Sequence, residues 1–117
     1  MEIFKEFSIE AAHWLPNVPE GHKCQRLHGH SFRIQVFVEG PVDSHMGWVM
    51  DFVDIKGAFQ TIEDKLDHRC LNDIEGLENP TSENLARWVW EHLRAELPEI
   101  SKVVVRETCT SGCVYTG

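Results

Sequence analysis

The sequence predicts an α+β fold in which two helices cover one face of an antiparallel sheet. Apolar residues recur at every second position in 3–11, interrupted only by Lys5, and at Phe32, Ile34, Val36 and Val38 within 28–39, which is the period of half-buried strands. They recur every three or four positions in 52–66 and 81–97, which is the period of amphipathic helices. The segments run strands, two helices, strands, and this order favours antiparallel pairing over repeated strand–helix–strand units.

Size and charge limit the classes of function. The 117 residues suffice for one domain, 1–117, with its own core. The net charge of −8 disfavours nucleic acid and anionic membranes as partners, because both attract a basic surface. No apolar stretch is long enough to cross a membrane, and the N-terminus has no signal-peptide pattern. We therefore expect a cytoplasmic protein whose four cysteines are reduced.

The predicted strands follow from alternation and turn residues. One face of the first strand carries Ile3, Phe7, Ile9 and Ala11. A loop with two prolines and a glycine follows at 14–27, and the second strand runs from His28 to Glu39. We expect a short strand at Trp48–Met50 to pair with the second strand. A β-branched strand at Lys102–Thr108 and a short one at Val114–Tyr115 complete the set.

Both helices have start signals. Asp51 is a candidate N-cap, and it precedes an apolar stripe of Phe52, Ile55, Phe59, Ile62 and Leu66. The second helix begins after Asn79-Pro80, with Thr81 or Ser82 as its cap. Its stripe comprises Leu85, Val89, Leu93 and Leu97. Pro98 ends this helix.

Three histidines are candidates for a metal site. His28 and His30 lie two residues apart in a strand, so both imidazoles project from one face. His13 ends the first strand with the parity of its apolar residues, so antiparallel pairing brings all three rings to one end of the sheet. Three neutral imidazoles with one open position are a ligand set of catalytic zinc. The alternative is that each histidine is satisfied separately by local hydrogen bonds.

Two further groups are candidates for proton transfer. Cys24 lies four residues before His28 among basic neighbours, which favour a reactive thiolate. Its alternative is a small buried thiol. Asp67 precedes His68 just after the first helix, where the carboxylate would orient the imidazole as a relay partner. The alternative is a histidinium that stabilises the helix C-terminus.

Glu107 has the parity of Val103 and Val105, which places an acid on an apolar face. Because buried carboxylates need partners, Glu107 is a candidate for holding a ligand through paired N–H donors. An exposed edge position is the alternative. We assign no role to the remaining thiols, Cys70, Cys109 and Cys113, because the C-x3-C pair lacks the second pair of a zinc ribbon.

Several motifs follow one another along nearly the whole chain. They are Glu10-Ala11-Ala12-His13, Cys24-Gln25-Arg26-Leu27-His28-Gly29-His30, Leu66-Asp67-His68, Asn79-Pro80-Thr81-Ser82-Glu83 and Glu107-Thr108. This set resembles the 6-pyruvoyl-tetrahydropterin synthase-like family. The three residues between Cys24 and the HGH motif resemble the bacterial branch that forms 6-carboxytetrahydropterin for queuosine biosynthesis. Animal pyruvoyl-forming members typically have five residues there.

The resemblance implies a tunnelling fold. Each subunit would contribute a four-stranded antiparallel sheet and two helices, three subunits would close an oligomeric barrel, and two trimers would form a homohexamer. The implied substrate is 7,8-dihydroneopterin triphosphate, converted to 6-carboxy-5,6,7,8-tetrahydropterin with loss of acetaldehyde and triphosphate. Lys23 and Arg26 are candidates for the cations that bind its phosphates.

The resemblance also assigns roles to residues. The implied Zn²⁺ ligands are His13, His28 and His30. Cys24 would accept a proton, and His68, oriented by Asp67, would complete the relay. Glu107, with Thr108 beside it, would bind the pterin.

Two other functions stay open at the level of sequence. One is a pyruvoyl-forming synthase, or a relative that cleaves the side chain to an aldehyde and a hydroxymethyl pterin. The other is a non-catalytic zinc- or pterin-binding module, against which Cys24 beside the metal motif argues.

Overall fold

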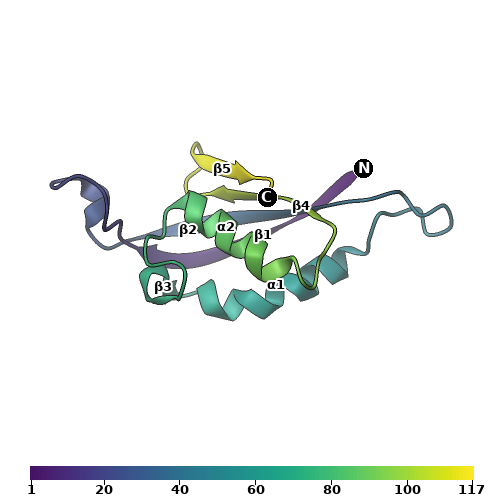
Figure 1. Cartoon of the computed structure of the whole chain (residues 1–117), viewed down its shortest axis with the longest axis horizontal. Coiled ribbons are helices and arrows are strands. Elements are labelled where there is room, and N and C mark those ends of the chain that lie inside the picture. Colours follow the sequence, from purple (N-terminus) through teal and green to yellow (C-terminus); the bar gives the residue numbers. More distant parts are fainter.

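The computed structural model describes all 117 residues as a curved sheet with two α-helices on one face (Figure 1). The elements in chain order are β1 (Glu2–His13), β2 (His28–Glu39), α1 (Phe52–Leu66), β3 (Arg69–Cys70), α2 (Ser82–Leu93), β4 (Ile100–Arg106) and β5 (Gly112–Tyr115). Short 3₁₀ turns lie at Lys23–Gln25 and Leu71–Asp73. No helix is both long and apolar enough to cross a bilayer.

The sheet has five strands in the order β3-β1-β2-β4-β5. All neighbours are antiparallel except β1 and β3, which run parallel where Ala11 and Ala12 face Arg69 and Cys70. The expected α+β class with two helices on one face is confirmed, but the four-stranded antiparallel sheet is wrong. The additional strand has only two residues, which is too short for alternation to reveal it in the sequence.

The strand predicted at Trp48–Met50 is also wrong. These residues lie in a loop whose turn is closed by Asp43, because its carboxylate accepts the backbone N–H groups of His45 and Met46. The Asp43 N–H in turn donates to the Trp48 carbonyl. Both edges of β2 are already paired, with β1 and β4, so the segment has no free edge of β2 to join.

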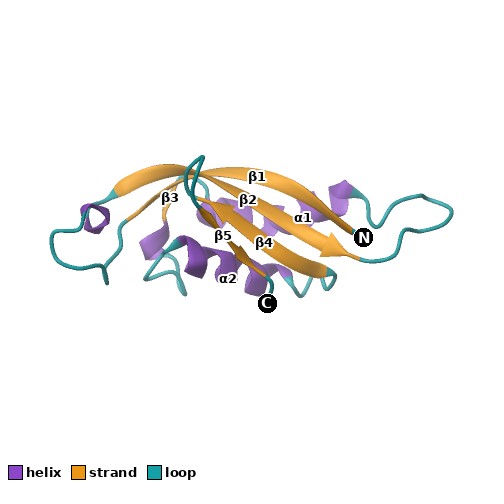
Figure 2. Cartoon of the chain, turned by 90° about the horizontal axis from the view of Figure 1, so that it is seen from above, coloured by secondary structure: helices purple, strands orange, loops and turns teal.

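The core lies between the helices and the inner face of the sheet, and Figure 2 shows the two layers. Helix α1 packs against β1, and α2 packs against β4 and β5. Phe7 of β1 stacks on Phe59 of α1 with ring centroids 4.0 Å apart. The predicted stripes of both helices are buried except for Phe52, which opens α1 and is 51% exposed. The face of the sheet away from the helices is called the outer face below.

Two other boundaries differ from the expected ones. Helix α2 ends at Leu93, and Leu97 is buried in the turn that follows. Strand β4 ends at Arg106, because the N–H groups of Glu107 and Thr108 both donate to the Ser111 carbonyl and turn the chain into β5. The loops at 14–27 and 40–51 project from opposite ends of the molecule (Figure 2).

Candidate metal centre

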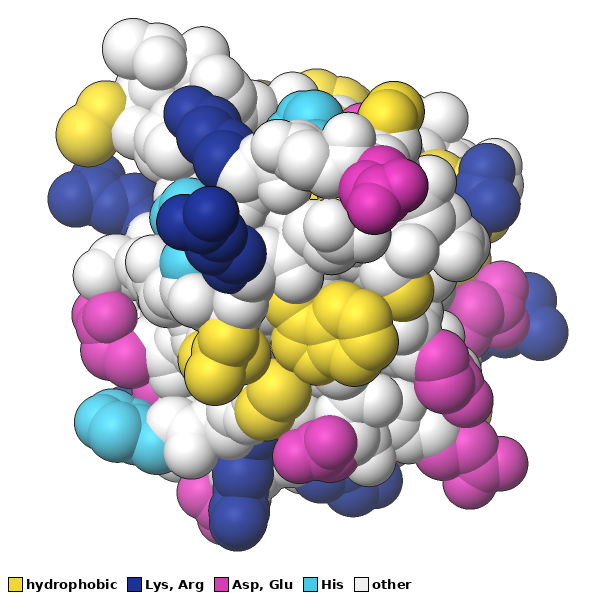
Figure 3. All heavy atoms as spheres, turned by 90° about the vertical axis from the view of Figure 1, so that its left-hand side faces the viewer, with side chains coloured by type: hydrophobic (Ala, Val, Ile, Leu, Met, Phe, Trp, Pro, Cys, Tyr) yellow, Lys and Arg dark blue, Asp and Glu magenta, His cyan; other side chains and the backbone are white.

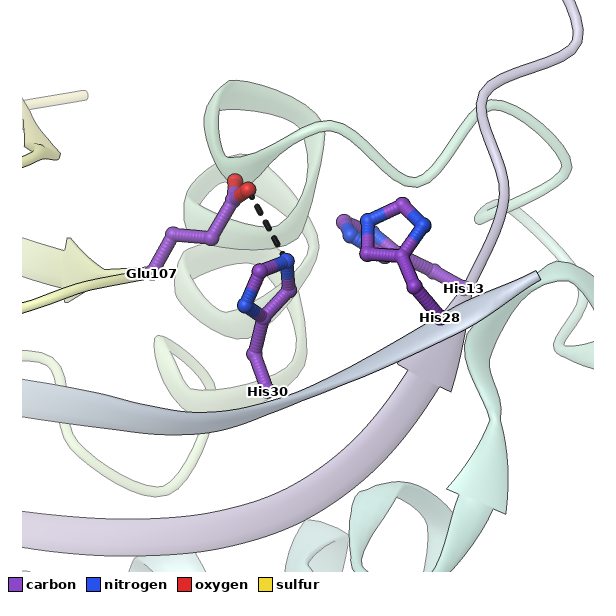
Figure 4. A group of neighbouring side chains, drawn as sticks. All are labelled: His13, His28, His30 and Glu107. Carbon is purple, nitrogen blue, oxygen red and sulfur yellow. Dashed lines mark ion pairs between the residues drawn. The ribbon is translucent and has the colours of Figure 1, made fainter. Parts of the chain in front are cut away.

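The register of β1 against β2 brings the three predicted histidines together. His13 lies directly opposite His28, and Ala11 lies opposite His30. The ring centroids of the three imidazoles are 4.5, 5.2 and 4.9 Å apart. Figure 4 shows the rings gathered on one side of the two strands, below the start of α2. The predicted convergence of the three imidazoles is confirmed.

The Nε2 nitrogens of these three histidines have no hydrogen-bond partner. The Nδ1 atoms of His13 and His28 lie 2.8 and 2.7 Å from the carbonyl oxygens of Pro80 and Arg26. A carbonyl only accepts, so each Nδ1 carries the ring proton and each Nε2 presents a lone pair. The Nε2 atoms of all three histidines are buried without a hydrogen-bond partner. Buried polar atoms of this kind require an occupant.

Glu107 adds a carboxylate to the same space. Its Oε1 lies 3.1 Å from His30 Nε2, although the contact lacks hydrogen-bond geometry (Figure 4). Its Oε2 accepts a 2.7 Å hydrogen bond from the Ser82 hydroxyl at the start of α2. The inward parity predicted for Glu107 is confirmed, and the side chain is 28% exposed. It is therefore not the exposed edge residue of the alternative interpretation.

The four side chains fit a cation. One ligand atom from each of His13, His28, His30 and Glu107 lies within 4.8 Å of the others. Lone pairs and a carboxylate oxygen at such distances repel one another unless a positive charge lies between them. In His13 and His28, the hydrogen bond from Nδ1 to a carbonyl group also fixes the tautomer in which Nε2 is free to bind a metal. Nitrogen and oxygen donors in this number suit Zn²⁺ and related divalent ions.

His13 is the most deeply placed ligand. Its side chain is completely buried, and this desolvation lowers its pKa from the ordinary value of about 6.5. The hydrogen bond to Pro80 opposes the shift, and the neighbouring His28 and His30 rings add to it. The ring is therefore neutral near pH 7, which is the form that binds metals.

The predicted relay pair lies elsewhere in the chain. His68 Nδ1 is 2.9 Å from Asp67 Oδ2, so the expected orientation of the imidazole by the carboxylate is present. The Glu10 N–H donates to Asp67 Oδ1, and this bond, with that from His68, lowers the pKa of Asp67. The His68 N–H donates back to the Glu10 carbonyl, and His68 has a φ of +58°. This positive φ is uncommon for a non-glycine residue, and the backbone bond holds it.

His68 lines a cavity of about 500 Å³ on the outer face. The strand residues that line it include Glu10, Ala12 and Ser31, which have the opposite parity to the three histidines, and also Ala11 and His30. The group of ligand atoms that lie within 4.8 Å of one another includes His30 but not His68. The side chain of His68 is 78% exposed. Within one chain, the structure therefore does not bring the Asp67–His68 pair to the histidine cluster.

The remaining predicted residues lie around the cluster rather than in it. Cys24 is half-buried in the 14–27 loop, where its carbonyl accepts the Leu15 N–H and its N–H donates to His22 Nδ1. Thr108 is exposed in the β4–β5 turn. All four cysteines are free thiols, and none belongs to the metal-ligand group.

Two positioning residues were not predicted from the sequence. Pro80 offers the carbonyl that orients His13, and Ser82 holds the carboxylate of Glu107. Both belong to the Asn79-Pro80-Thr81-Ser82 segment, which the sequence predicts as a helix start and as one of the family motifs. Thr81 is the observed N-cap, because its hydroxyl accepts the Asn84 N–H. The sequence offered two successive candidate caps, Thr81 and Ser82, but it did not show that Ser82 contacts Glu107.

Comparison with known proteins places this geometry in a family. The family model described as 6-pyruvoyl tetrahydropterin synthase matches residues 2–117. The chain belongs to this family. A Synechocystis sp. protein named 6-carboxy-5,6,7,8-tetrahydropterin synthase is 49% identical over 97% of this chain and 91% of its own length. A Pyrococcus furiosus protein named dihydroneopterin monophosphate aldolase is 41% identical over 82% of this chain and 77% of its own length.

The fold is shared with a solved member of the family. The structure of Caenorhabditis elegans 6-pyruvoyl tetrahydropterin synthase superposes with a TM-score of 0.91 at 28% identity. The match covers 100% of this chain and 95% of that protein. The overall fold is thus preserved at low sequence identity.

We expect His28→Ala to abolish stoichiometric metal binding, because it removes one of three imidazole donors that share one ion. Metal content after dialysis against Zn²⁺, measured by mass spectrometry of the dissolved ions, is expected to fall from about one ion per chain to near zero. His45→Ala is the control, because His45 is exposed in the 40–51 loop. Full zinc occupancy in His28→Ala would place the metal elsewhere.

Acidification should destabilise the metal-free protein through His13. Its pKa is lowered by burial, so below about pH 6.5 the unfolded chain binds a proton that the folded chain does not. The free energy of unfolding should therefore decrease as the pH falls through this range. Thermal unfolding after chelation measures the slope, which should be shallower in His13→Asn, where the amide still donates to Pro80. Parallel pH curves for the two proteins would contradict this assignment.

Proposed function

We propose that the protein is a zinc-dependent carbon–carbon lyase. It converts 7,8-dihydroneopterin triphosphate and one water molecule to 6-carboxy-5,6,7,8-tetrahydropterin, acetaldehyde and triphosphate, as a step of queuosine biosynthesis. The observation that carries the proposal is the set of three buried imidazole nitrogens without partners, next to the Glu107 carboxylate. The 49% identity to a protein named 6-carboxy-5,6,7,8-tetrahydropterin synthase supports the choice of product.

His13, His28 and His30 would hold the Zn²⁺ ion. When bound, zinc polarises the hydroxyl oxygens of the pterin side chain and makes their protons and those on adjacent carbons easier to remove. The chain's contribution is to keep the His13 ring neutral through burial, and to orient His13 and His28 through the carbonyls of Pro80 and Arg26.

Glu107 would bind the pterin ring. A pterin presents an amino group and a ring N–H side by side, and a carboxylate accepts both in a bidentate contact. The hydrogen bond from Ser82 fixes the carboxylate beside His30, so a ring held there lies next to the histidine cluster. Thr108, the next residue, borders the same turn.

Cys24 and the Asp67–His68 pair would move the protons. The thiolate accepts a proton from the side chain, and the imidazole, oriented by Asp67, delivers one. Because the pair faces the outer side of the sheet in its own chain, we propose that a neighbouring subunit of a homohexamer supplies it. The unpaired edges of β1 before Ala11 and of β5 support such assembly, since open edges favour pairing with another chain.

The local charge suits an anionic substrate despite the net charge of −8. At the end of the molecule from which the 14–27 loop projects, Lys and Arg side chains lie beside histidines, while most acidic side chains lie at the periphery of the view (Figure 3). A few local cations are sufficient to attract a phosphate ester.

Aldol cleavage of the same side chain is the second candidate. The Pyrococcus furiosus relative named dihydroneopterin monophosphate aldolase is 41% identical to this chain. A metal that polarises the side-chain hydroxyls also serves a cleavage that leaves an aldehyde and a hydroxymethyl pterin. A pyruvoyl-forming reaction uses the same substrate.

Product analysis separates these reactions. The zinc-loaded protein is incubated with 7,8-dihydroneopterin triphosphate, and the pterins and aldehydes are identified by mass spectrometry. We expect 6-carboxytetrahydropterin and acetaldehyde in equal amounts. A hydroxymethyl pterin, or a pyruvoyl pterin with no aldehyde, would replace the proposal with the corresponding alternative. Binding of zinc and pterin without turnover would indicate a non-catalytic module.

Cys24→Ala should lower kcat by about 10²–10⁴ while zinc content stays near that of the wild type, because it removes a proton acceptor and no ligand. His68→Ala should give a loss of similar size. Cys113→Ala is the control, since Cys113 is a half-buried thiol of β5 to which no role is assigned. Wild-type turnover in Cys24→Ala would make Cys24 a packing residue, and loss of zinc would make it a metal ligand.

Glu107→Gln should weaken pterin binding by about 1.5–3 kcal/mol, because one carboxylate oxygen is replaced by a donor that faces the N–H groups of the ligand. Fluorescence titration with a pterin measures this change. Zinc content should change little, and Glu99→Gln, an exposed glutamate before β4, should bind pterin normally. Unchanged affinity in Glu107→Gln would show that Glu107 does not bind the pterin.

A further inference from the structure

Two arginines on the outer face of the sheet lie side by side without an acidic partner. Arg33 of β2 and Arg106 at the end of β4 are directly opposite each other in the strand ladder, and both are exposed. Like charges in directly opposed positions destabilise a sheet when no counter-charge is present. None of the four ion pairs of the structure involves either guanidinium.

Two acids on the same face, Glu6 and Glu10, are bonded to neutral side chains instead. Glu6 accepts a 3.1 Å hydrogen bond from Gln35, and Glu10 accepts a 2.7 Å bond from Ser31. Gln35 and Ser31 are the outer-face neighbours of Arg33 along β2, and Ser8 lies opposite Arg33 on β1. The chain has a net charge of −8, yet these two adjacent cations form no ion pair with an acidic side chain.

The pair opens onto a cavity of about 350 Å³. Its lining residues are Ser31, Arg33, Arg106, Glu107, Thr108 and Cys109. Thr108 Oγ1 accepts the Thr110 N–H, which leaves its hydroxyl proton to donate. Glu107 borders this cavity and also contacts His30 at 3.1 Å, so the cavity lies next to the candidate metal centre.

We propose that Arg33 and Arg106 form a polyphosphate-binding subsite. Two guanidinium groups offer planar pairs of N–H donors, which match the oxygens of a phosphate bidentately, and Thr108 adds a hydroxyl donor. The bound anion provides the counter-charge that the ladder lacks. The proposal rests on the proposed function for its ligand, which is the triphosphate group, either as part of the pterin ester or as the released inorganic anion.

The first experiment uses inorganic tripolyphosphate at constant ionic strength. Arg33→Gln and Arg106→Gln should each weaken its binding about tenfold or more, measured by calorimetry, and Arg33→Lys should give a smaller loss because it keeps the charge. Arg94→Gln is the control, since Arg94 pairs with Glu91 on α2. Binding by the two glutamine variants that equals the wild type, or falls only as much as in Arg94→Gln, would overturn the proposal.

Thermal unfolding gives a signature specific to opposed like charges. In phosphate-free buffer, Arg33→Gln and Arg106→Gln should unfold at the wild-type temperature or above it, because each relieves repulsion. Tripolyphosphate should raise the unfolding temperature of the wild type and much less that of the variants. A lower unfolding temperature of both variants without the anion would overturn the proposal, because the pair would then be stabilising by itself.

Kinetics distinguish the two sources of the anion. If the subsite binds the ester, both glutamine variants should raise KM for 7,8-dihydroneopterin triphosphate about tenfold, with unchanged affinity for unphosphorylated dihydroneopterin. If it binds the released anion, inhibition by tripolyphosphate should weaken while KM stays constant. Loss of affinity in Arg26→Gln instead of these variants would assign the phosphates to the 14–27 loop and overturn the proposal.

Failure of this subsite differs from failure of the proposed function. Turnover of the ester with wild-type KM and inhibition in both variants would leave the lyase and overturn the subsite. Absence of turnover in the wild type, with tripolyphosphate binding that depends on both arginines, would leave the subsite and overturn the lyase. A change in solution mass of the variants with unchanged tripolyphosphate affinity would make the pair a contact between copies, and would also overturn the proposal.

Discussion

The three imidazoles face one another because the hydrophobic core fixes the register of β1 against β2. Four inward side chains of β2 are completely buried: Phe32, Ile34, Val36 and Val38. Burial of each contributes about 1.5–3 kcal/mol. A slip of one residue would expose all of them and would turn His28 and His30 to the outer face. The core thus positions the ligands before any metal binds, and the repulsion among their lone pairs is offset by this burial.

The same alternation gives the two faces of the sheet different chemistry. The inner face ends in three imidazoles and a carboxylate, beneath the start of α2. The outer face carries the Asp67–His68 pair at the β1 edge and the two arginines at the β4 end. Glu107 lies where β4 has ended, and it borders both the cluster and the outer-face cavity. In the proposed reaction, an assembly of several subunits would bring together the groups of the two faces.

The sequence was sufficient wherever periodicity was long. Strand β2 has the predicted bounds, and the parity of His13, His28, His30 and Glu107 followed from alternation alone. Short or non-local features were missed. Strand β3 has only two residues, which is too short for a period. Trp48–Met50 has strand-like residues, but no edge of β2 is free to pair with it. Phe52 fits the apolar spacing of α1 but lies outside the core. The contacts of Pro80 and Ser82 join segments far apart in the chain, so no local pattern contains them.

The central claim is that three imidazole nitrogens, and no thiolate, hold one ion. X-ray absorption at the zinc edge of the metal-loaded protein tests it most directly, because zinc–nitrogen and zinc–sulfur distances differ by about 0.2–0.3 Å. We expect a shell of nitrogen and oxygen scatterers at about 2.0–2.1 Å with the multiple-scattering pattern of three imidazoles. A sulfur scatterer at about 2.3 Å would contradict the account, because it would place a cysteine such as Cys24 on the metal.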